Sequence, residues 1–359
     1  MSLCYELVTR GLRVVLVDRH HEGRATDAGA GILSPETFLD PDDGWAVLAR
    51  SAGEHHRTLN GRVREDGAGG TGIEECGLIR ISTSEAEDEY LAAGTELARR
   101  RTPGVVTEID PEEAVRAFPA LGKVRAAMFN PMAARIDGRR ATEAVAQAAR
   151  ARGLESIDGE VTSLDLGKDR ALGVQSTEGS ISAGTVAIAG GAWSSRFADQ
   201  LGTDLPVTPM KGQIVHMRLP GTETGSWPII QPVFSYYLVP WPGGRIACGG
   251  TLEARAGFDA RQTAGGIYEL LREGLRTAPG LAEATVEEVR VGLRPSSVDD
   301  RPVLGTLPGW SNVHVATGHG TEGLLLGPYT AALLAESIVS GSVPEQIAAL
   351  SPARFVREP

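Results

Sequence analysis

The residues best suited to bind a cofactor lie where strands are expected to end. Asp18 closes an apolar run, and a glycine turn at 318–320 separates a strand-like segment, 312–316, from a helical one that begins near Glu322. In a doubly wound fold an acid at such a strand end commonly bonds a ribose hydroxyl, although alone it is more often a solvated turn residue. Backbone amides of residues 320–324 would lie at a helix N-terminus and point towards negative charge.

Two further stretches are rich in glycine and other small residues. Residues 24–35 form a loop of small side chains, and residues 189–194 resemble a strand end, a glycine turn and a helix start. Small side chains allow the backbone to approach a ligand closely. Neither stretch identifies a ligand by itself, because ordinary tight turns use the same residues.

Alternating strand-like and helix-like segments must position these residues. We expect a helix that ends before Gly11, a helix start at Asp110-Pro111, and further helices at 45–59, 85–101, 138–152, 263–278 and 322–340. We expect strands at 12–18, 77–82, 212–218, 236–240, 245–251, 286–293 and 312–316, and several more between 159 and 188. The continuous apolar run at 12–18 indicates a strand buried on both faces. Because the β-rich segments interrupt the α/β ones, we predict two interleaved domains.

Composition excludes several classes of protein. The 359 residues include 35 Lys and Arg against 46 Asp and Glu, for a net charge of -11. This balance disfavours nucleic acid or an anionic membrane as the main partner. No apolar run approaches the ~18 residues of a membrane span, and we expect no signal peptide.

The cysteines and histidines give no sign of a metal site. Cys4, Cys76 and Cys248 lie far apart, which excludes a disulfide framework and favours buried free thiols in a cytoplasmic protein. The adjacent pairs His20-His21 and His55-His56 cannot share one face of a helix, so metal binding is not expected.

The most specific pattern is a series of short motifs in a fixed order. They are Arg10-Gly11 through Asp18, Thr26-Asp27-Ala28-Gly29-Ala30-Gly31-Ile32-Leu33-Ser34-Pro35, Ala189-Gly190-Gly191-Ala192-Trp193-Ser194, Lys211-Gly212-Gln213, Tyr237-Leu238-Val239-Pro240, Gly249-Gly250-Thr251, Val291-Gly292-Leu293-Arg294-Pro295, Asp299-Asp300-Arg301-Pro302-Val303-Leu304-Gly305 and the segment 312–324. Together they resemble the FAD-dependent amine and D-amino-acid oxidoreductases, which include glycine oxidase, sarcosine oxidase and D-amino-acid dehydrogenase. The resemblance covers nearly the whole chain, and glycine oxidase is the most similar branch.

This resemblance implies an α/β fold in which a doubly wound, Rossmann-like FAD-binding domain is interleaved with a substrate domain built on a mixed or antiparallel sheet. We expect residues 1–80, 133–206 and 287–359 in the FAD-binding domain, and residues 81–132 and 207–286 in the substrate-binding domain. FAD is expected to be bound non-covalently, because no cysteine lies in the C-terminal region where covalent relatives attach it.

The cofactor-binding residues implied by the resemblance lie in five segments. They are Asp18 and Arg19; Thr26, Ala30, Gly31, Ile32 and Leu33; Val161; Gly190, Gly191 and Trp193; and Gly318, His319, Gly320, Thr321, Glu322, Gly323 and Leu324. The helix N-terminus in the last segment would stabilise the anion that reduced flavin carries around N1 and the C2 carbonyl. His319 is not expected to act as a general base.

Arg294 and Tyr237 are the catalytic candidates. A guanidinium binds a carboxylate through two parallel hydrogen bonds, and the resemblance assigns Arg294 to the carboxylate of the substrate. Tyr237 matches a tyrosine at the same carboxylate, but Tyr236 leaves the register open, because only one of two adjacent strand residues faces the pocket. Leu252 is a candidate pocket wall and is equally suited to a core.

The implied reaction is oxidative deamination of a small amino acid or secondary amine such as glycine, sarcosine or a D-amino acid. A hydride would pass from Cα to flavin N5, and water would hydrolyse the imine to a keto acid and ammonia. The sequence leaves open whether oxygen or another acceptor reoxidises the flavin, and whether the protein forms a homo-oligomer. A flavoprotein dehydrogenase subunit that passes electrons to a partner is therefore an alternative.

One part of the family pattern is absent from the chain. In the family the first strand and its G-x-G-x-x-G pyrophosphate turn would precede Met1. We expect segments 14–17 and 313–316 to lack a shared neighbouring strand as a result. Either the true start lies upstream, or the chain is a truncated, catalytically silent paralogue or binding protein that has lost FAD.

Overall fold

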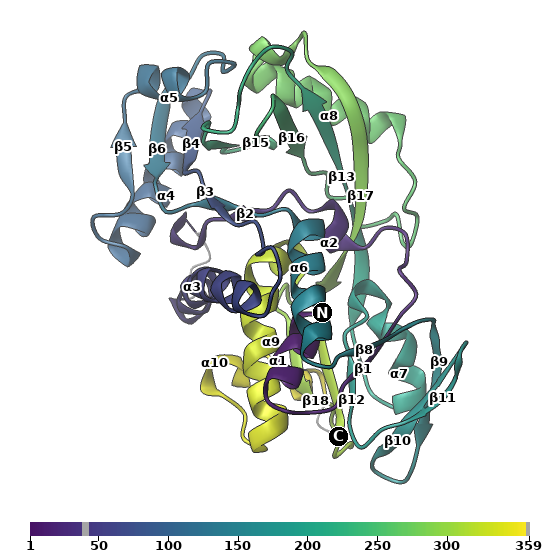
Figure 1. The fold of residues 1–359 in the computed structure, drawn as a ribbon. Coiled ribbons are helices and arrows are strands. Elements are labelled where there is room, and N and C mark those ends of the chain that lie inside the picture. The colour runs from purple at the N-terminus through teal and green to yellow at the C-terminus, as the bar shows by residue number, and fades with distance from the viewer. Residues whose placement is uncertain (38–42, 357–359) are drawn as a thin grey trace.

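The computed structural model describes residues 1–37 and 43–356, which form an upper and a lower lobe (Figure 1). The upper lobe is built on one eight-stranded mixed sheet of order β17-β13-β16-β15-β14-β4-β6-β5. Its strands are β4 (Leu78–Ser82), β5 (Thr107–Ile109), β6 (Ala126–Asn130), β13 (Val207–Arg218), β14 (Ile229–Pro232), β15 (Tyr237–Trp241), β16 (Arg245–Gly249) and β17 (Thr285–Ser297). The described part of the chain begins and ends in the lower lobe.

Helices cover the two faces of this sheet unequally. On one face α5 (Pro111–Ala117) and α8 (Ala264–Thr277) pack on Ile79, Ile81 and the neighbouring core residues, followed by the short η3 (Pro279–Leu281). On the other face α4 (Glu85–Arg101) covers only the β4–β6 end, where Leu91 packs on Met128. The β13–β17 end of that second face is turned towards the lower lobe and carries the candidate site.

The lower lobe contains several small sheets. Parallel β1 (Val15–Asp18) and β8 (Glu155–Asp158) form one, and β12 (Val186–Ile188), β19 (Val313–Thr317) and β18 (Val303–Thr306) form another in that order. The remaining strands are the antiparallel β9 (Val161–Leu166), β10 (Ala171–Ser176) and β11 (Gly179–Ser182), and the short β2 (Ile32–Leu33), β3 (Glu74–Glu75) and β7 (Ala134–Arg135).

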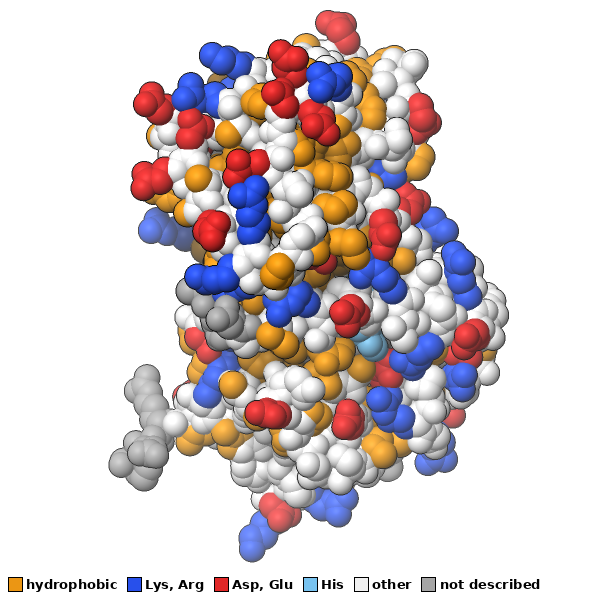
Figure 2. Space-filling view, turned by 90° about the vertical axis from the view of Figure 1, so that its left-hand side faces the viewer, with side chains coloured by type: hydrophobic (Ala, Val, Ile, Leu, Met, Phe, Trp, Pro, Cys, Tyr) orange, Lys and Arg blue, Asp and Glu red, His pale blue; other side chains and the backbone are white. Residues whose placement is uncertain are grey.

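Helices pack around these small sheets. They are α1 (Ser2–Thr9), α2 (Ala25–Ala28), α3 (Asp43–Glu65), α6 (Gly138–Ala151), α7 (Ala198–Leu201), α9 (Gly323–Ser340) and α10 (Glu345–Ala348), with the 3-10 turns η1 (Pro35–Thr37), η2 (Gly191–Phe197), η4 (Gly320–Glu322) and η5 (Pro352–Phe355). Figure 2 shows a constriction between the two lobes, where hydrophobic side chains gather beside basic and acidic ones.

Local signals in the sequence explain where the helices begin. Ser84 and Glu87 form a capping box at the start of α4, so the predicted helix 85–101 is confirmed. Asp110 caps α5 by accepting a hydrogen bond from the Glu112 amide, with Pro111 in the first turn. Asp137 caps α6 in the same way.

One sequence-based expectation about the strands is wrong. β1 is half-buried, not buried on both faces, because among the described residues it pairs only with β8. Segments 14–17 and 313–316 share no neighbouring strand in the described part of the chain, as expected, since β1 pairs with β8 whereas β19 lies between β12 and β18. The predicted domain division stays a prediction, and its boundaries at 80/81 and 286/287 fall within β4 and β17.

The apolar helix α9 lies in the core of the lower lobe. Residues 320–340 meet the length and hydropathy of a membrane span, so the expectation that no apolar run approaches that length is wrong. Buried leucines of this helix, such as Leu326 and Leu334, pack against other core residues. Pro328 within the helix has no N–H, so the Leu324 carbonyl lacks its helical donor. The buried His56 replaces that donor, with Nε2 2.9 Å from the Leu324 oxygen. Burial lowers the pKa of His56 to about 4, so the ring donates as a neutral imidazole.

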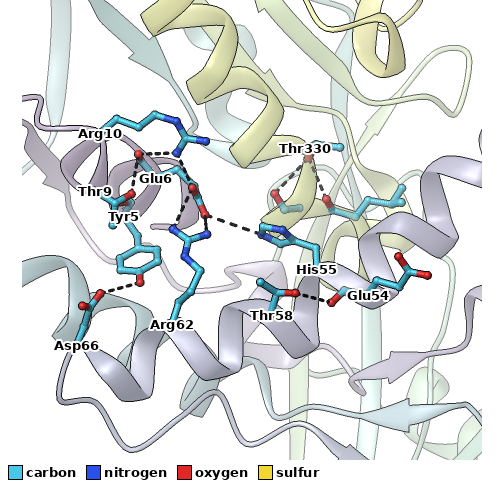
Figure 3. A network of polar contacts seen from close by, with 12 residues as sticks. Tyr5, Glu6, Thr9, Arg10, Glu54, His55, Thr58, Arg62, Asp66 and Thr330 are labelled. Atoms are coloured by element: carbon cyan, nitrogen blue, oxygen red, sulfur yellow. Dashed lines mark hydrogen bonds and ion pairs between the residues drawn. The ribbon is translucent and has the colours of Figure 1, made fainter.

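A buried carboxylate ties α1 to α3 (Figure 3). Glu6 is only 2% exposed, and Arg62 Nη1 donates to its Oε1 over 2.8 Å while Arg10 Nη1 donates to its Oε2 over 2.5 Å. Burial raises the pKa of Glu6, but the hydrogen bonds from Arg62 and Arg10 outweigh it and hold the pKa below the ordinary value. A carboxyl with a lowered pKa stabilises the fold above its unfolded-state pKa, and that stability is lost as the pH falls through the folded-state pKa.

Replacing Arg62 by methionine is expected to lower the free energy of unfolding by about 2–4 kcal/mol at neutral pH, since Glu6 stays buried with one arginine fewer. The loss should shrink below about pH 4, where the unfolded carboxyl protonates. Urea titrations at several pH values would measure it, with the exposed neighbour Arg64→Met as the control. An equal loss in both variants at all pH values would contradict this account of Glu6.

Candidate active site

The guanidinium of Arg294 lies across the neighbouring strand β13. Its Nη1 donates to the Thr251 carbonyl over 2.8 Å. A Cβ built on Gly212 would come within 2.2 Å of Nη1, so only glycine allows this approach. Arg294 is half-buried and forms no ion pair with any carboxylate in the described part of the chain. Its positive charge is therefore available to an anion from outside.

Tyr237 shares the site with Arg294. A Cβ on Gly250 would lie 2.9 Å from Arg294 Nη2 and 3.1 Å from the Tyr237 hydroxyl, so this glycine makes room for both groups. Burial raises the pKa of Tyr237 to about 12 even though the charge of Arg294 opposes the shift. The phenol is therefore neutral and can donate a hydrogen bond.

The structure settles the register of the two adjacent tyrosines. Tyr236 faces the opposite side of the sheet, where it packs at the core under α8 and its hydroxyl donates to Glu269. Tyr237 is thus the tyrosine on the Arg294 face. Leu252 is 65% exposed, so it is not a core residue and is free to border a pocket.

A buried polar cluster beneath the site holds the Thr251 carbonyl in place. Glu253 accepts hydrogen bonds from Thr251 Oγ1 over 2.6 Å and from Gln213 Nε2 over 2.8 Å. Lys211 is only 1% exposed and its Nζ lies 3.6 Å from Glu253 Oε2. These contacts fix the loop after β16 against β13, and so they fix the acceptor that orients Arg294.

The turn after β19 lies beside the end of β17. Gly318 and Gly320 have φ of +75° and +51°, which glycine adopts at no steric cost. An isolated β-bridge joins Ser296 to His319, so Arg294 is two residues from the strand position that touches the turn. Arginine and turn are therefore neighbours, as the sequence predicts.

The histidine of this turn is neutral. His319 Nε2 lies 2.9 Å from Thr330 Oγ1, which itself donates to the Leu326 carbonyl, so the histidine is the donor. Burial lowers the pKa of His319 to about 4. Beside it, Glu322 is half-buried, accepts from Thr321 Oγ1 and has its pKa raised by burial, while Thr321 is exposed.

The small-residue loop meets the same turn. Leu324 packs on Gly29, where a Cβ would lie 2.5 Å from its Cδ1. Gly31 crosses the backbone of Ile136 so closely that a Cβ would lie 1.8 Å from the carbonyl oxygen. Ala30 and Leu33 are buried in the core, so only their backbone can face a ligand, and Ile32 is half-buried on β2. Thr26 lies in α2, against the start of α6.

The second glycine turn is also attached to the end of β19. Thr317 Oγ1 donates to the Gly191 carbonyl over 2.8 Å. Gly191 has φ of +55° and open space above it, and the nearby Ser194 Oγ is buried without a partner. The turns at 190–191 and 318–320 thus lie together, and the Ser194 hydroxyl beside them has no hydrogen-bond partner among the described residues.

The remaining predicted cofactor residues form a second group. Asp18 is half-exposed at the end of β1 and accepts from the His20 amide and from Arg24. Arg19 pairs with Glu160, the residue before Val161. Trp193 stacks on His21 with ring centroids 4.2 Å apart. This group lies around the C-terminal end of β1, and an isolated β-bridge joins Arg24 to Leu293, the residue before Arg294.

The residues present fit FAD in two respects. The first turn of α9 leaves backbone amides without helical partners, as an anionic ring edge requires, and a Cβ added at Gly191 or Gly320 would meet nothing within 4 Å.

Among the described residues no group of three or more His, Cys, Asp or Glu is placed to hold a metal.

The lobed α/β fold, the paired glycine turns at a helix N-terminus and the unpaired arginine define a flavin-type oxidoreductase. The FAD dependent oxidoreductase family, DAO, matches residues 1–337, so the chain belongs to this family and FAD is its cofactor.

Individual relatives agree with the family. The chain is 33% identical to the Bacillus subtilis oxidoreductase YurR over 98% of its own length and 95% of YurR, and 31% identical to Pseudomonas aeruginosa glycine oxidase over 94% and 91%. The crystal structure of iminodiacetate oxidase from Chelativorans sp. BNC1 matches with a TM-score of 0.92 and 34% identity, covering 98% of this chain and 95% of that one. The predicted α/β flavoprotein fold is confirmed.

The sequence motifs did not reveal why two of their glycines are needed. Gly212 and Gly250 lie in recognised motifs, but only the structure shows that each makes room for Arg294. The available signal was that each glycine lies within a stretch predicted to be a strand.

Replacing Gly212 by alanine is expected to displace the guanidinium while leaving the fold intact, because the atom met by the new Cβ is the end of a flexible side chain. Loss of a bidentate, charge-assisted contact should raise KM for carboxylate substrates about 10- to 100-fold. Steady-state kinetics and thermal unfolding would measure both effects. Gly184→Ala, at an open position, is the control, and an unchanged KM would contradict the placement of Arg294.

Proposed function

We propose that this protein oxidises a small amino acid or secondary amine at its Cα–N bond. The observation that carries the proposal is the unpaired Arg294 guanidinium, with the Tyr237 hydroxyl beside it and the turn 318–320 as a neighbour. A carboxylate is the anion that a planar guanidinium and a neutral phenol bind best. The names of two relatives, glycine oxidase and iminodiacetate oxidase, support an amino-acid substrate.

The side chains of this site orient the substrate. Arg294 holds the carboxylate, and the Thr251 carbonyl fixes the plane of the guanidinium from behind. Tyr237 donates a further hydrogen bond as a neutral phenol. When bound, FAD supplies the two-electron oxidation by accepting a hydride. The substrate amine must be neutral, so orientation and electrostatics suffice and no protein base is required.

The amides at the start of α9 are proposed to stabilise negative charge on the cofactor. Asp18 is proposed to bind at the nucleotide end, where its carboxylate is half-exposed. We also place the protein in the cytoplasm, which agrees with its three free cysteines, of which Cys248 is buried and Cys4 and Cys76 are half-buried.

The test mixes FAD-loaded protein with glycine, sarcosine, D-alanine and iminodiacetate, and follows flavin absorbance and peroxide. Flavin reduction with peroxide release identifies an oxidase, whereas reduction without peroxide identifies a dehydrogenase that needs another acceptor. Absence of reduction by every carboxylate-bearing amine, at millimolar concentration, would overturn the proposed function.

A further inference from the structure

A second arginine is buried in the substrate-side sheet without a partner. Arg80 lies between Ile79 and Ile81 in the buried strand β4 and is 8% exposed. Its Nε has no hydrogen-bond partner, and within the described residues it forms no ion pair. Buried charges in proteins are normally paired, so an unpaired one of this kind points to a missing anion.

The strand register places Arg80 on the Tyr237 face. Arg80 pairs with Gln231 of β14, and the antiparallel pairing of Ile230 with Leu238 sets Gln231 opposite Tyr237 of β15. Residues directly opposite one another share a face of the sheet. Tyr237, Gln231 and Arg80 therefore form one row, and Ile79 and Ile81 point the other way into the core.

Arg294 lies on the same face, on the other side of Tyr237. Arg294 of β17 is opposite Met210 of β13, and Ile214 lies on the same face of β13 because it is four residues further along. Ile214 is opposite Gly249 of β16, and Gly249 is in turn opposite Tyr237 of β15. Neighbouring strands lie about 4.8 Å apart, so the backbone of Arg80 is about 10 Å from that of Tyr237, and a long side chain can span much of this gap. A substrate above Tyr237 thus has one arginine on each side.

Two described acids beside this end of the sheet have other hydrogen-bond partners. Asp88 of α4 accepts hydrogen bonds from Ser82 and Arg125. Glu36 of η1 accepts from Asn130. Burial lowers the pKa of Arg80, and no neighbouring charge contributes to that shift. The described protein offers Arg80 no counter-charge of its own.

We propose that Arg80 is a second anion-binding residue of the substrate site, and that the physiological substrate is an amine with two carboxylates, one held by Arg294 and the other by Arg80. This inference rests on the proposed function and names its substrate class. Two kinds of amine have this chemistry: a secondary amine with a carboxylate on each arm, and a primary amino dicarboxylic acid.

Matched substrate pairs test the proposal. Iminodiacetate is compared with sarcosine, which keeps the secondary amine but has one carboxylate, and D-aspartate is compared with D-alanine. The FAD-loaded protein is expected to prefer the dicarboxylate of at least one pair at least 10-fold in kcat/KM. The pair that shows the larger preference identifies the kind of amine. Equal kcat/KM values within both pairs would overturn the inference.

Variants of Arg80 separate binding from a structural role. Arg80→Met should lower kcat/KM for the preferred dicarboxylate about 30-fold or more and leave the monocarboxylate within about 3-fold, and Arg80→Lys should restore part of the loss. Arg99→Met, an exposed arginine of α4, is the control. Without substrate, Arg80→Met should unfold at the same or a higher temperature, because an unpaired charge is removed. Equal losses for both substrates, with a lower Tm, would make Arg80 structural.

A binding measurement keeps this inference independent of turnover. Iminodiacetate or D-aspartate should raise the Tm of the unmutated protein and should raise that of Arg80→Met much less. Stabilisation without oxidation of any substrate would overturn the proposed function and support the dicarboxylate site. Oxidation of sarcosine, together with equal behaviour of Arg80→Met and the unmutated protein towards dicarboxylates, would support the proposed function and overturn the dicarboxylate site.

Discussion

Replacing Arg294 by methionine is expected to lower kcat/KM for a carboxylate-bearing amine by about 30- to 5000-fold, which corresponds to about 2–5 kcal/mol. The reason is that the guanidinium is the group on this face whose charge is both unpaired and adjacent to the turn 318–320, so its loss leaves the substrate carboxylate desolvated without a partner. Steady-state kinetics with the FAD-loaded protein would measure the loss.

Two further variants sharpen the result. Arg294→Lys keeps the charge but cannot bind both carboxylate oxygens while donating to Thr251, so an intermediate loss is expected. Arg116→Met removes a charge that is 67% exposed on α5, and it should leave kcat/KM unchanged. Unaltered kinetics in Arg294→Met would remove this residue from the site.

Replacing Gly31 by alanine is expected to be the most destabilising single-methyl change in the small-residue loop 24–35. Gly31 has φ of +83°, and the new methyl would lie 1.8 Å from the Ile136 carbonyl oxygen, which belongs to a backbone held by the hydrogen bond from the Ile136 amide to the Gly31 carbonyl. A clash with backbone cannot be relieved by a rotamer change. We expect the free energy of unfolding to fall by about 4 kcal/mol or more, and we expect the variant to fail to retain FAD.

Gly11→Ala provides the matched control, because Gly11 has nearly the same φ, +82°, and nothing within 4 Å of the added methyl. It should lower the free energy of unfolding by only about 1–2 kcal/mol, which is the cost of placing alanine in a left-handed backbone conformation. Urea unfolding followed by circular dichroism would compare the two. Similar losses for both variants would show that the crossing of Gly31 with Ile136 is not as close as described.

Local signals allowed the helices and the nature of the fold to be predicted from the sequence. Capping residues such as Ser84 and Asp110 act within a few positions of one another, so their meaning does not depend on the rest of the chain. Strand neighbours depend on distant segments. The position of β19 between β12 and β18 could therefore not be deduced from the sequence.

The candidate site shows the same limit. Motifs identified Arg294 and the turn beside it, but the choice between Tyr236 and Tyr237 depended on Glu269, a partner 33 positions along the chain. Arg80 was missed because one arginine in an apolar strand has meaning only when its cross-strand neighbours are known. The signal was present in Leu78-Ile79-Arg80-Ile81, a charge within a buried run.

The central claim is that Arg294 holds the carboxylate of an amine beside a reducible flavin. Anaerobic mixing of the FAD-loaded protein with sarcosine and, separately, with dimethylamine tests it most directly, because the two amines differ by the carboxylate. Loss of flavin absorbance near 450 nm should be fast with sarcosine and at least 30-fold slower with dimethylamine, and Arg294→Met should remove the difference. Equal reduction rates for the two amines in the unmutated protein, or a difference that survives in Arg294→Met, would contradict the account.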